Sequence, residues 1–198
     1  MIKTTEAPIL ITGVFRSGTT LISQILNNHP NLSIVYDSVN FMRFCYDRYN
    51  PINNIENATK LVDDLFERIN TRWNFSFDTR SVINQIKDTT ISYSLIYNTV
   101  MYELLLKGDN SKKYWGEKTT LVWSKIPSFF EMFPNGRVVH IIRDPRAILA
   151  SWKTFTHAPG YDYLDSTFNC IDSMQKMNMY TEKFETKRYC SVRFEDLV

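Results

Sequence analysis

A glycine- and threonine-rich run near the N-terminus has the residue types of a phosphate-binding loop. Gly13 and Gly18 follow an apolar stretch at residues 8–13 and precede a predicted helix. In such a loop, backbone N–H groups and the helix dipole converge on an anion. The glycine spacing is that of a P-loop, but Thr19 stands where an NTP-cleaving loop has lysine, and the cation comes earlier, at Arg16. The pattern predicts a phosphate cradle that is not built for the triphosphate of ATP or GTP.

A second cationic loop follows another apolar stretch, residues 137–142. Arg143 and Arg146 flank Asp144 and Pro145, which suit the N-cap and the first position of a helix. Ligands of open α/β sheets bind beyond the carboxyl ends of the strands, so we expect both loops to face one crevice. Guanidinium groups pair well with phosphate dianions. Two such pockets indicate a nucleotide phosphorylated at two places.

Apolar strands that alternate with amphipathic helices must position these loops. The strands are expected at residues 8–13, 32–35, 113–118, 137–142 and 188–194. The helices are expected at residues 18–27, 58–69, 91–105, 122–133, 145–155 and 164–185. The inward side chains of the last helix are expected to be Phe168, Ile171, Met174, Met177 and Phe184. This order predicts an α/β fold with a mainly parallel central sheet flanked by helices in three layers. A length of 198 residues favours one domain.

Composition excludes several functional classes. The net charge is +2, with no basic run, which argues against a nucleic-acid binder. The cysteines Cys45, Cys170 and Cys190 lie far apart without a C-x-x-C pair, so we expect free thiols in a reducing compartment and no metal site. The chain has no signal peptide and no apolar run of membrane-spanning length, so we expect a cytoplasmic protein. Its oligomeric state is not predicted.

The ordered motifs resemble a known family. The loop from Gly13 to Leu21, followed by Arg143-Asp144-Pro145-Arg146 and then Ser151, resembles the sulfotransferases that use 3′-phosphoadenosine 5′-phosphosulfate (PAPS), in particular bacterial members and tyrosylprotein sulfotransferases. Three further segments agree with it, at residues 28–30, 115–119 and 192–197. The resemblance runs from residue 8 to the last residue. It implies one P-loop-like nucleotide-binding domain over residues 1–198. Because more sequence normally follows in this family, we expect the domain to be incomplete at its C-terminus.

The resemblance assigns roles to individual residues. The 5′-phosphosulfate loop would consist of Arg16, Ser17, Gly18, Thr19 and Thr20. The 3′-phosphate would be bound by Arg143 and Ser151, with Arg146 as a weaker candidate for the same site. The catalytic residues would be Asp37, Lys118 and Arg16. Lys118 would lie near the sulfuryl group, and Asp37, eight residues after His29, would act as the base that takes the acceptor proton. His157 is a further candidate for that base.

The implied reaction is in-line transfer of a sulfuryl group from PAPS to a hydroxyl or amine acceptor, which leaves 3′-phosphoadenosine 5′-phosphate (PAP). A sulfuryl group carries less negative charge than a phosphoryl group, so no metal is expected. The acceptor, whether a small molecule, a glycan or a peptide, cannot be identified from the sequence.

Other functions and other local roles remain open at this point. The chain could be a P-loop kinase or NTPase, against which the missing lysine argues, or a non-catalytic module that binds PAP or PAPS. Asp37 could be a plain helix N-cap, and Lys118 could form a solvent-exposed pair with Glu117. Arg143 and Arg146 could be surface residues paired with Asp144 or Glu195.

Overall fold

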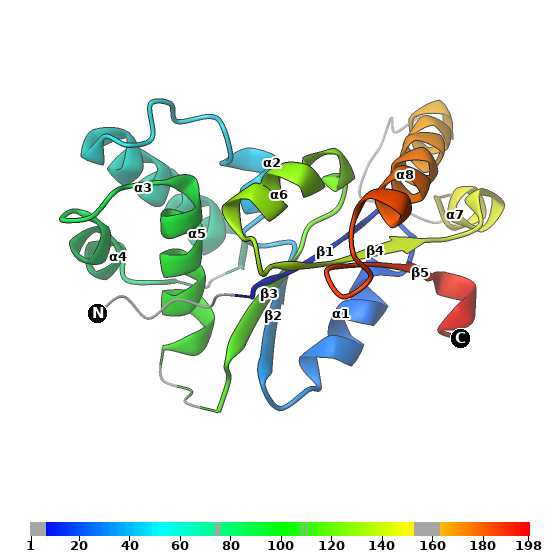
Figure 1. Cartoon of the computed structure of the whole chain (residues 1–198), viewed down its shortest axis with the longest axis horizontal. Coiled ribbons are helices and arrows are strands. Elements are labelled where there is room, and N and C mark those ends of the chain that lie inside the picture. The colour runs from blue at the N-terminus through cyan, green and yellow to red at the C-terminus, as the bar shows by residue number, and fades with distance from the viewer. Residues whose placement is uncertain (1–6, 74–75, 108, 110, 153–162) are drawn as a thin grey trace.

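The computed structural model describes residues 7–73, 76–107, 109, 111–152 and 163–198. Within these residues the core is a five-stranded sheet that is parallel throughout, in the order β2-β3-β1-β4-β5 (Figure 1). The strands are β1 (Ile9–Gly13), β2 (Leu32–Tyr36), β3 (Tyr114–Lys118), β4 (Arg137–Ile142) and β5 (Tyr189–Arg193). The predicted α/β fold with a parallel sheet is therefore confirmed.

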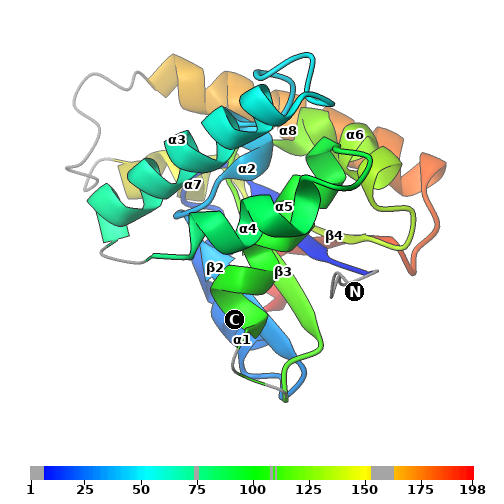
Figure 2. The same cartoon turned by 90° about the vertical axis from the view of Figure 1, so that its left-hand side faces the viewer.

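Helices cover both faces of this sheet. They are α1 (Thr19–Asn27), α2 (Phe41–Phe44), α3 (Ile55–Trp73), α4 (Thr79–Ile86), α5 (Tyr93–Met101), α6 (Ile126–Met132), α7 (Pro145–Trp152) and α8 (Tyr163–Lys183). The structure also contains a short π-helix at Tyr102–Leu106 and 3₁₀ turns at Trp123–Lys125 and Phe194–Asp196. Helix α1 packs below the sheet, whereas α2, α6 and α8 lie above it (Figures 1 and 2). The arrangement has the three predicted layers.

The strand β1 lies at the centre because both of its faces are apolar. All five of its residues are buried, as expected of a parallel strand with helices on each side. Ile9 and Ile11 pack toward α1 with Ile22, and Leu10 joins the larger core on the opposite face with Trp115. This burial holds the end of β1, from which the glycine-rich loop departs, in a rigid position.

The register of the sheet brings three strand ends together. Ile11 of β1 is the partner of Lys118 of β3, and Gly13 of β1 is the partner of Ile141 of β4. Beyond β3, the N–H of Leu121 donates to the carbonyl oxygen of Gly13 at 3.2 Å. The loops that follow β1, β3 and β4 therefore leave the sheet side by side.

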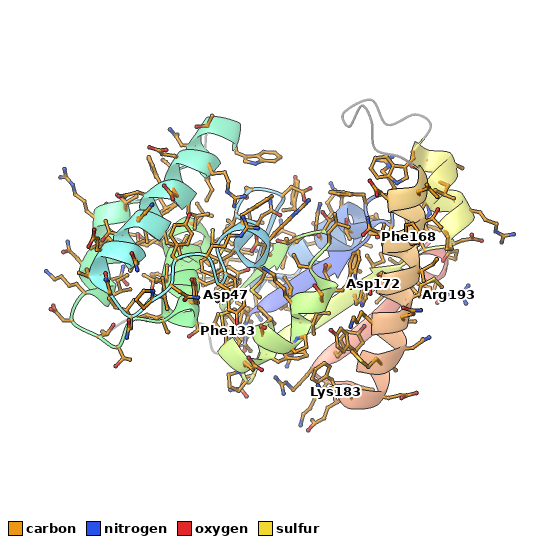
Figure 3. The ribbon with its side chains drawn as sticks, turned by 90° about the horizontal axis from the view of Figure 1, so that it is seen from above. Asp47, Phe133, Phe168, Asp172, Lys183 and Arg193 are labelled. Carbon is orange, nitrogen blue, oxygen red and sulfur yellow. The ribbon has the colours of Figure 1, made fainter. Side chains whose placement is uncertain are left out.

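The predicted inward face of α8 was wrong at three of its five positions, whereas Met177 is half-buried and Phe184, just beyond the helix, packs against the core. The side chains of Phe168, Ile171 and Met174 are exposed, and the buried positions are Ser166, Cys170, Ser173 and Tyr180. Ser173 Oγ lies 2.8 Å from His140 Nε2, and Asp172 accepts a 2.6 Å hydrogen bond from Trp123 Nε1. Figure 3 shows Phe168 and Asp172 on neighbouring turns of α8. Polar pairing with His140 and Trp123, together with the burial of Cys170 and Tyr180, sets the orientation of this helix. In the part of the chain that the structure describes, no helix is long and apolar enough to cross a bilayer.

Candidate active site

The loop between β1 and α1 is closed by its own hydrogen bonds. Arg16 has a φ of 67° and Gly18 a φ of 95°, so the chain turns twice through the left-handed region before α1 begins. Ser17 Oγ donates to the carbonyl oxygen of Val14 at 2.7 Å, and the Ser17 N–H donates to the same oxygen at 3.2 Å. Ser17 therefore shapes the loop. The first-turn N–H groups of α1, at Thr19 and Thr20, have no acceptor within the helix and are available to an anion.

Both predicted glycines are required by close packing. A Cβ on Gly13 would lie 2.5 Å from the carbonyl oxygen of Ile141. A Cβ on Gly18 would lie 2.3 Å from Cδ2 of Phe194, at a φ that L side chains rarely adopt. The glycines thus allow the loop to pack against β4 and against the 3₁₀ turn at the end of the chain.

Arg143, which follows β4, joins this loop. Its Nη1 donates to the carbonyl oxygen of Arg16 at 2.9 Å, and its guanidinium carbon lies 4.2 Å from the centre of the Phe194 ring. A cavity of about 180 Å³ lies between the two loops, and its lining consists of Arg16, Gly18, Thr19, Thr20 and Arg143. The expectation that the two loops share one crevice is confirmed.

Ser151 and Arg146 occupy different positions relative to this cavity. Ser151, on α7, accepts a 2.8 Å hydrogen bond from Arg16 Nε, so it lies beside the loop. Arg146 has a side chain that is 91% exposed and pairs with Asp144 at 2.6 Å. Hydrogen bonds from Arg146 hold the pKa of the Asp144 carboxyl down at about 2. The surface-pair alternative therefore describes Arg146, whereas Arg143 is directed into the loop.

Asp37 and Lys118 form an ion pair at the ends of β2 and β3. Lys118 is only 2% exposed, whereas the Asp37 side chain is 41% exposed. Asp37 has a φ of 58°, so the chain leaves β2 abruptly at this residue. The N-cap alternative is wrong, since α2 starts after Asn40 and the Asp37 carboxylate is directed to Lys118. The alternative of a solvent-exposed pair between Lys118 and Glu117 is wrong as well, because both residues are buried.

Glu117 has a structural role that the sequence reasoning missed. Its carboxylate accepts hydrogen bonds from the N–H groups of Asn40 and Phe41, the latter at 3.3 Å, and from the hydroxyl of Tyr97. Burial raises the pKa of Glu117, and these hydrogen bonds oppose the rise. The available signal was the alternation of β3, which puts Glu117 on the same face as the apolar Trp115. Glu117 thereby fixes the segment between Asp37 and α2.

The comparisons with known proteins agree with this geometry. The family model described as "Sulfotransferase family" matches residues 8–198. The chain belongs to the sulfotransferase family. A search of the curated proteins gave no match.

Several solved sulfotransferase structures share the fold. The sulfotransferase domain of the Synechococcus PCC 7002 olefin synthase has a TM-score of 0.62 at 18% identity, over 98% of this chain and 68% of that one. The sulfotransferase domain of the curacin biosynthetic pathway has a TM-score of 0.57 at 16% identity, over 98% and 69%. Sulfotransferase STF1 of Mycobacterium tuberculosis H37Rv has a TM-score of 0.53 at 15% identity, over 99% and 64%. At these low sequence identities, the similarity shows that this chain and the three solved structures share a fold.

Two other site predictions concern His157 and metals. His157 lies outside the residues that the structure describes. Within the described part of the sulfotransferase, no cluster of three or more His, Cys, Asp or Glu side chains could hold a metal ion.

Proposed function

We propose that this sulfotransferase transfers a sulfuryl group from PAPS to a hydroxyl or amine acceptor. The observation that carries the proposal is the cavity shared by the loop at Arg16 and by Arg143. It places cations and helix N-terminal N–H groups from two different loops around one space. Such an arrangement suits a nucleotide with phosphate groups at two positions.

The polar atoms around the cavity fit an anionic donor. Arg143 Nε is buried and has no hydrogen-bond partner among the described residues. An unpaired buried donor of this kind costs about 1–3 kcal/mol, a cost that a bound phosphate would remove. The N–H groups of Thr19 and Thr20 would hold the 5′-phosphosulfate, and Arg143 and Ser151 would hold the 3′-phosphate. Arg146 contributes less, because it already pairs with Asp144.

Asp37 and Lys118 supply the chemistry of transfer. Asp37 takes the proton of the acceptor hydroxyl as the acceptor oxygen forms its bond to sulfur. The bond between sulfur and the bridging oxygen breaks, and its electron pair stays on the 5′-phosphate of the departing PAP. Arg16 and Lys118 stabilise the charge that develops on this oxygen, an effect worth roughly 3–4 kcal/mol per donor in comparable sites. A positioned base adds about 10²–10⁴-fold.

We further propose that the enzyme works in a reducing, cytoplasmic environment. Cys45 and Cys170 are buried free thiols, and burial raises the pKa of both. Thiols of this kind are typical of reducing compartments.

Two measurements on the full chain test the proposed reaction. PAP at 100 times its Kd should stabilise the protein by about 2.7 kcal/mol, read as a rise in Tm. Sulfate transfer from labelled PAPS to a panel of alcohols and amines should be abolished in Lys118→Ala. Magnesium-dependent ATP turnover without any response to PAP would favour a kinase or NTPase instead. A PAP response without transfer to any acceptor would favour a non-catalytic binding module.

A further inference from the structure

A second cavity, which we call the edge pocket, lies next to Asp37 at the free edge of the sheet. It encloses about 230 Å³ and is lined by Ile34, Val35, Tyr36, Ser38, Trp73 and Leu105. Strand β2 is the outermost strand on this side, so within the described residues no further strand covers it. The pocket lies between β2, the end of α3 and the π-helical stretch after α5.

One buried polar group in the edge pocket lacks a hydrogen-bond partner among the described residues. Ser38 is 5% exposed, and its Oγ forms no hydrogen bond with any of the described residues. A buried hydroxyl without a partner costs about 1–3 kcal/mol. An apolar pocket with a few placed polar groups is the usual form of a small-molecule site. The unpaired hydroxyl therefore points to a ligand that carries a hydrogen-bonding group.

The position of the edge pocket connects it to the catalytic pair. Tyr36 and Ser38 are the chain neighbours of Asp37, whose carboxylate pairs with the buried Lys118. The pocket is therefore lined by both chain neighbours of the residue that we propose as the base. An acceptor seated there would have its hydroxyl close to Asp37 and its body along β2.

We propose that the edge pocket binds the acceptor, and that the acceptor is a small uncharged alcohol with an apolar body. This inference rests on the proposed function and adds the substrate class. Among the described residues, no charged side chain lines the edge pocket, which disfavours acidic peptides and charged sugars. A neutral sugar needs several hydrogen-bond partners, whereas the described lining offers one buried unpaired hydroxyl, at Ser38, and the polar ends of the exposed Tyr36 and Trp73. Tyr36 and Trp73, which are 41% and 46% exposed, provide aromatic surface for the body of the alcohol.

The test uses the full chain with 2-naphthol as the probe, and with glucose and an acidic tyrosine-containing peptide as competing acceptors. 2-Naphthol should have the highest kcat/KM of the three. Trp73→Ala should raise the KM for 2-naphthol about tenfold, the equivalent of about 1.4 kcal/mol, with little change in kcat. The Kd of PAP should stay as in the wild type. Phe168→Ala, which removes an exposed aromatic ring from α8, is the matched control and should change neither constant.

Ser38→Ala separates ligand binding from stability. Because the variant removes an unpaired buried hydroxyl, its Tm without ligand should equal or exceed that of the wild type. Its affinity for 2-naphthol, measured by equilibrium dialysis, should nevertheless fall severalfold. A fall in Tm with unchanged affinity would overturn the inference.

The remaining outcomes distinguish this inference from the proposed function. If PAP binds but glucose or the peptide is the better acceptor, the edge pocket inference is wrong and PAPS dependence stands. If wild-type protein does not bind 2-naphthol in dialysis, the inference is also wrong. If PAP fails to bind, the proposed function is wrong. Loss of 2-naphthol binding in Trp73→Ala would then still show that the edge pocket binds 2-naphthol.

Discussion

Arg143 Nη1 donates a 2.9 Å hydrogen bond to the carbonyl oxygen of Arg16. The two residues are far apart in the chain and follow different strands, but the pairing of β1 with β4 brings them together. The bond ties the second cationic loop to the phosphate cradle. It also orients one guanidinium while the buried Nε stays unpaired among the described residues. The two loops therefore act as one binding unit.

The first prediction concerns Arg143. Arg143→Ala should raise the Kd of PAP about 10- to 100-fold, because a hydrogen bond to a charged group contributes about 1.5–3 kcal/mol. Arg143→Lys should give an intermediate Kd, since lysine keeps the charge but loses the forked geometry. Isothermal titration with PAP measures both. Arg146→Ala is the control with a smaller expected effect, because Arg146 is exposed and paired with Asp144. Wild-type affinity in Arg143→Ala would contradict the assignment.

The second prediction concerns the Asp37–Lys118 ion pair. Asp37→Asn should lower kcat by about 10²–10⁴-fold through loss of the base. It should also lower the free energy of unfolding by roughly 1–3 kcal/mol, because the buried Lys118 ammonium loses its partner. Lys118→Met removes the charge with similar side-chain length.

A double-mutant cycle over these two positions checks the pair. With urea unfolding as the readout, the loss in Asp37→Asn should shrink when Lys118→Met is already present. Additive losses would show that the two side chains are not coupled. The kcat loss of Asp37→Asn is measured with Lys118 intact, since removal of Lys118 should itself abolish transfer.

The third prediction concerns Glu117. Glu117→Gln should destabilise the protein by about 1–3 kcal/mol, because an amide N–H₂ replaces one oxygen that now accepts from a donor. Tyr97→Phe is the milder partner variant, since it removes one donor and leaves the backbone N–H groups of Asn40 and Phe41 bound. Chemical denaturation measures the free energy of unfolding, which should be highest for the wild type, lower for Tyr97→Phe and lowest for Glu117→Gln. Equal stability of Glu117→Gln and wild type would show that the carboxylate does not fix this segment.

Much of the fold could be predicted because apolar runs and turn residues mark it clearly. The five buried residues of β1 and the strand at 137–142 are bounded by glycine, proline and arginine, so their type and order are evident. The face of α8 could not be predicted, because polar residues pair inward while Phe168 and Ile171 stay exposed. Hydrophobic periodicity detects a helix but does not report which polar side chains find buried partners.

The candidate site could be predicted in part for a similar reason. The proximity of Arg16 and Arg143 follows from two strand ends at one edge of a parallel sheet. The role of Glu117 depends on the packing of α5 against β3, which no local motif specifies. The edge pocket depends likewise on where Trp73, at the end of α3, meets β2. Long-range packing of this kind is absent from the spacing of motifs.

The last prediction concerns the pH dependence of stability through His140. This side chain is buried between the hydroxyls of Tyr189 and Ser173, each 2.8 Å from a ring nitrogen, and lies parallel to Trp123. Burial lowers the pKa of His140 from 6.5 to about 4. The unfolded chain therefore binds a proton more readily, so the free energy of unfolding should fall as the pH drops from about 6.5 toward 4.

The loss should approach about 3 kcal/mol below pH 4 and vanish above pH 7. Urea unfolding between pH 4.5 and 7.5 measures it, with the acid-side slope compared in wild type and His140→Gln. The slope should flatten in His140→Gln because its titrating group is gone. If His140→Gln retained the full slope over this range, the acid sensitivity would come from other groups and the buried histidine would not be its source.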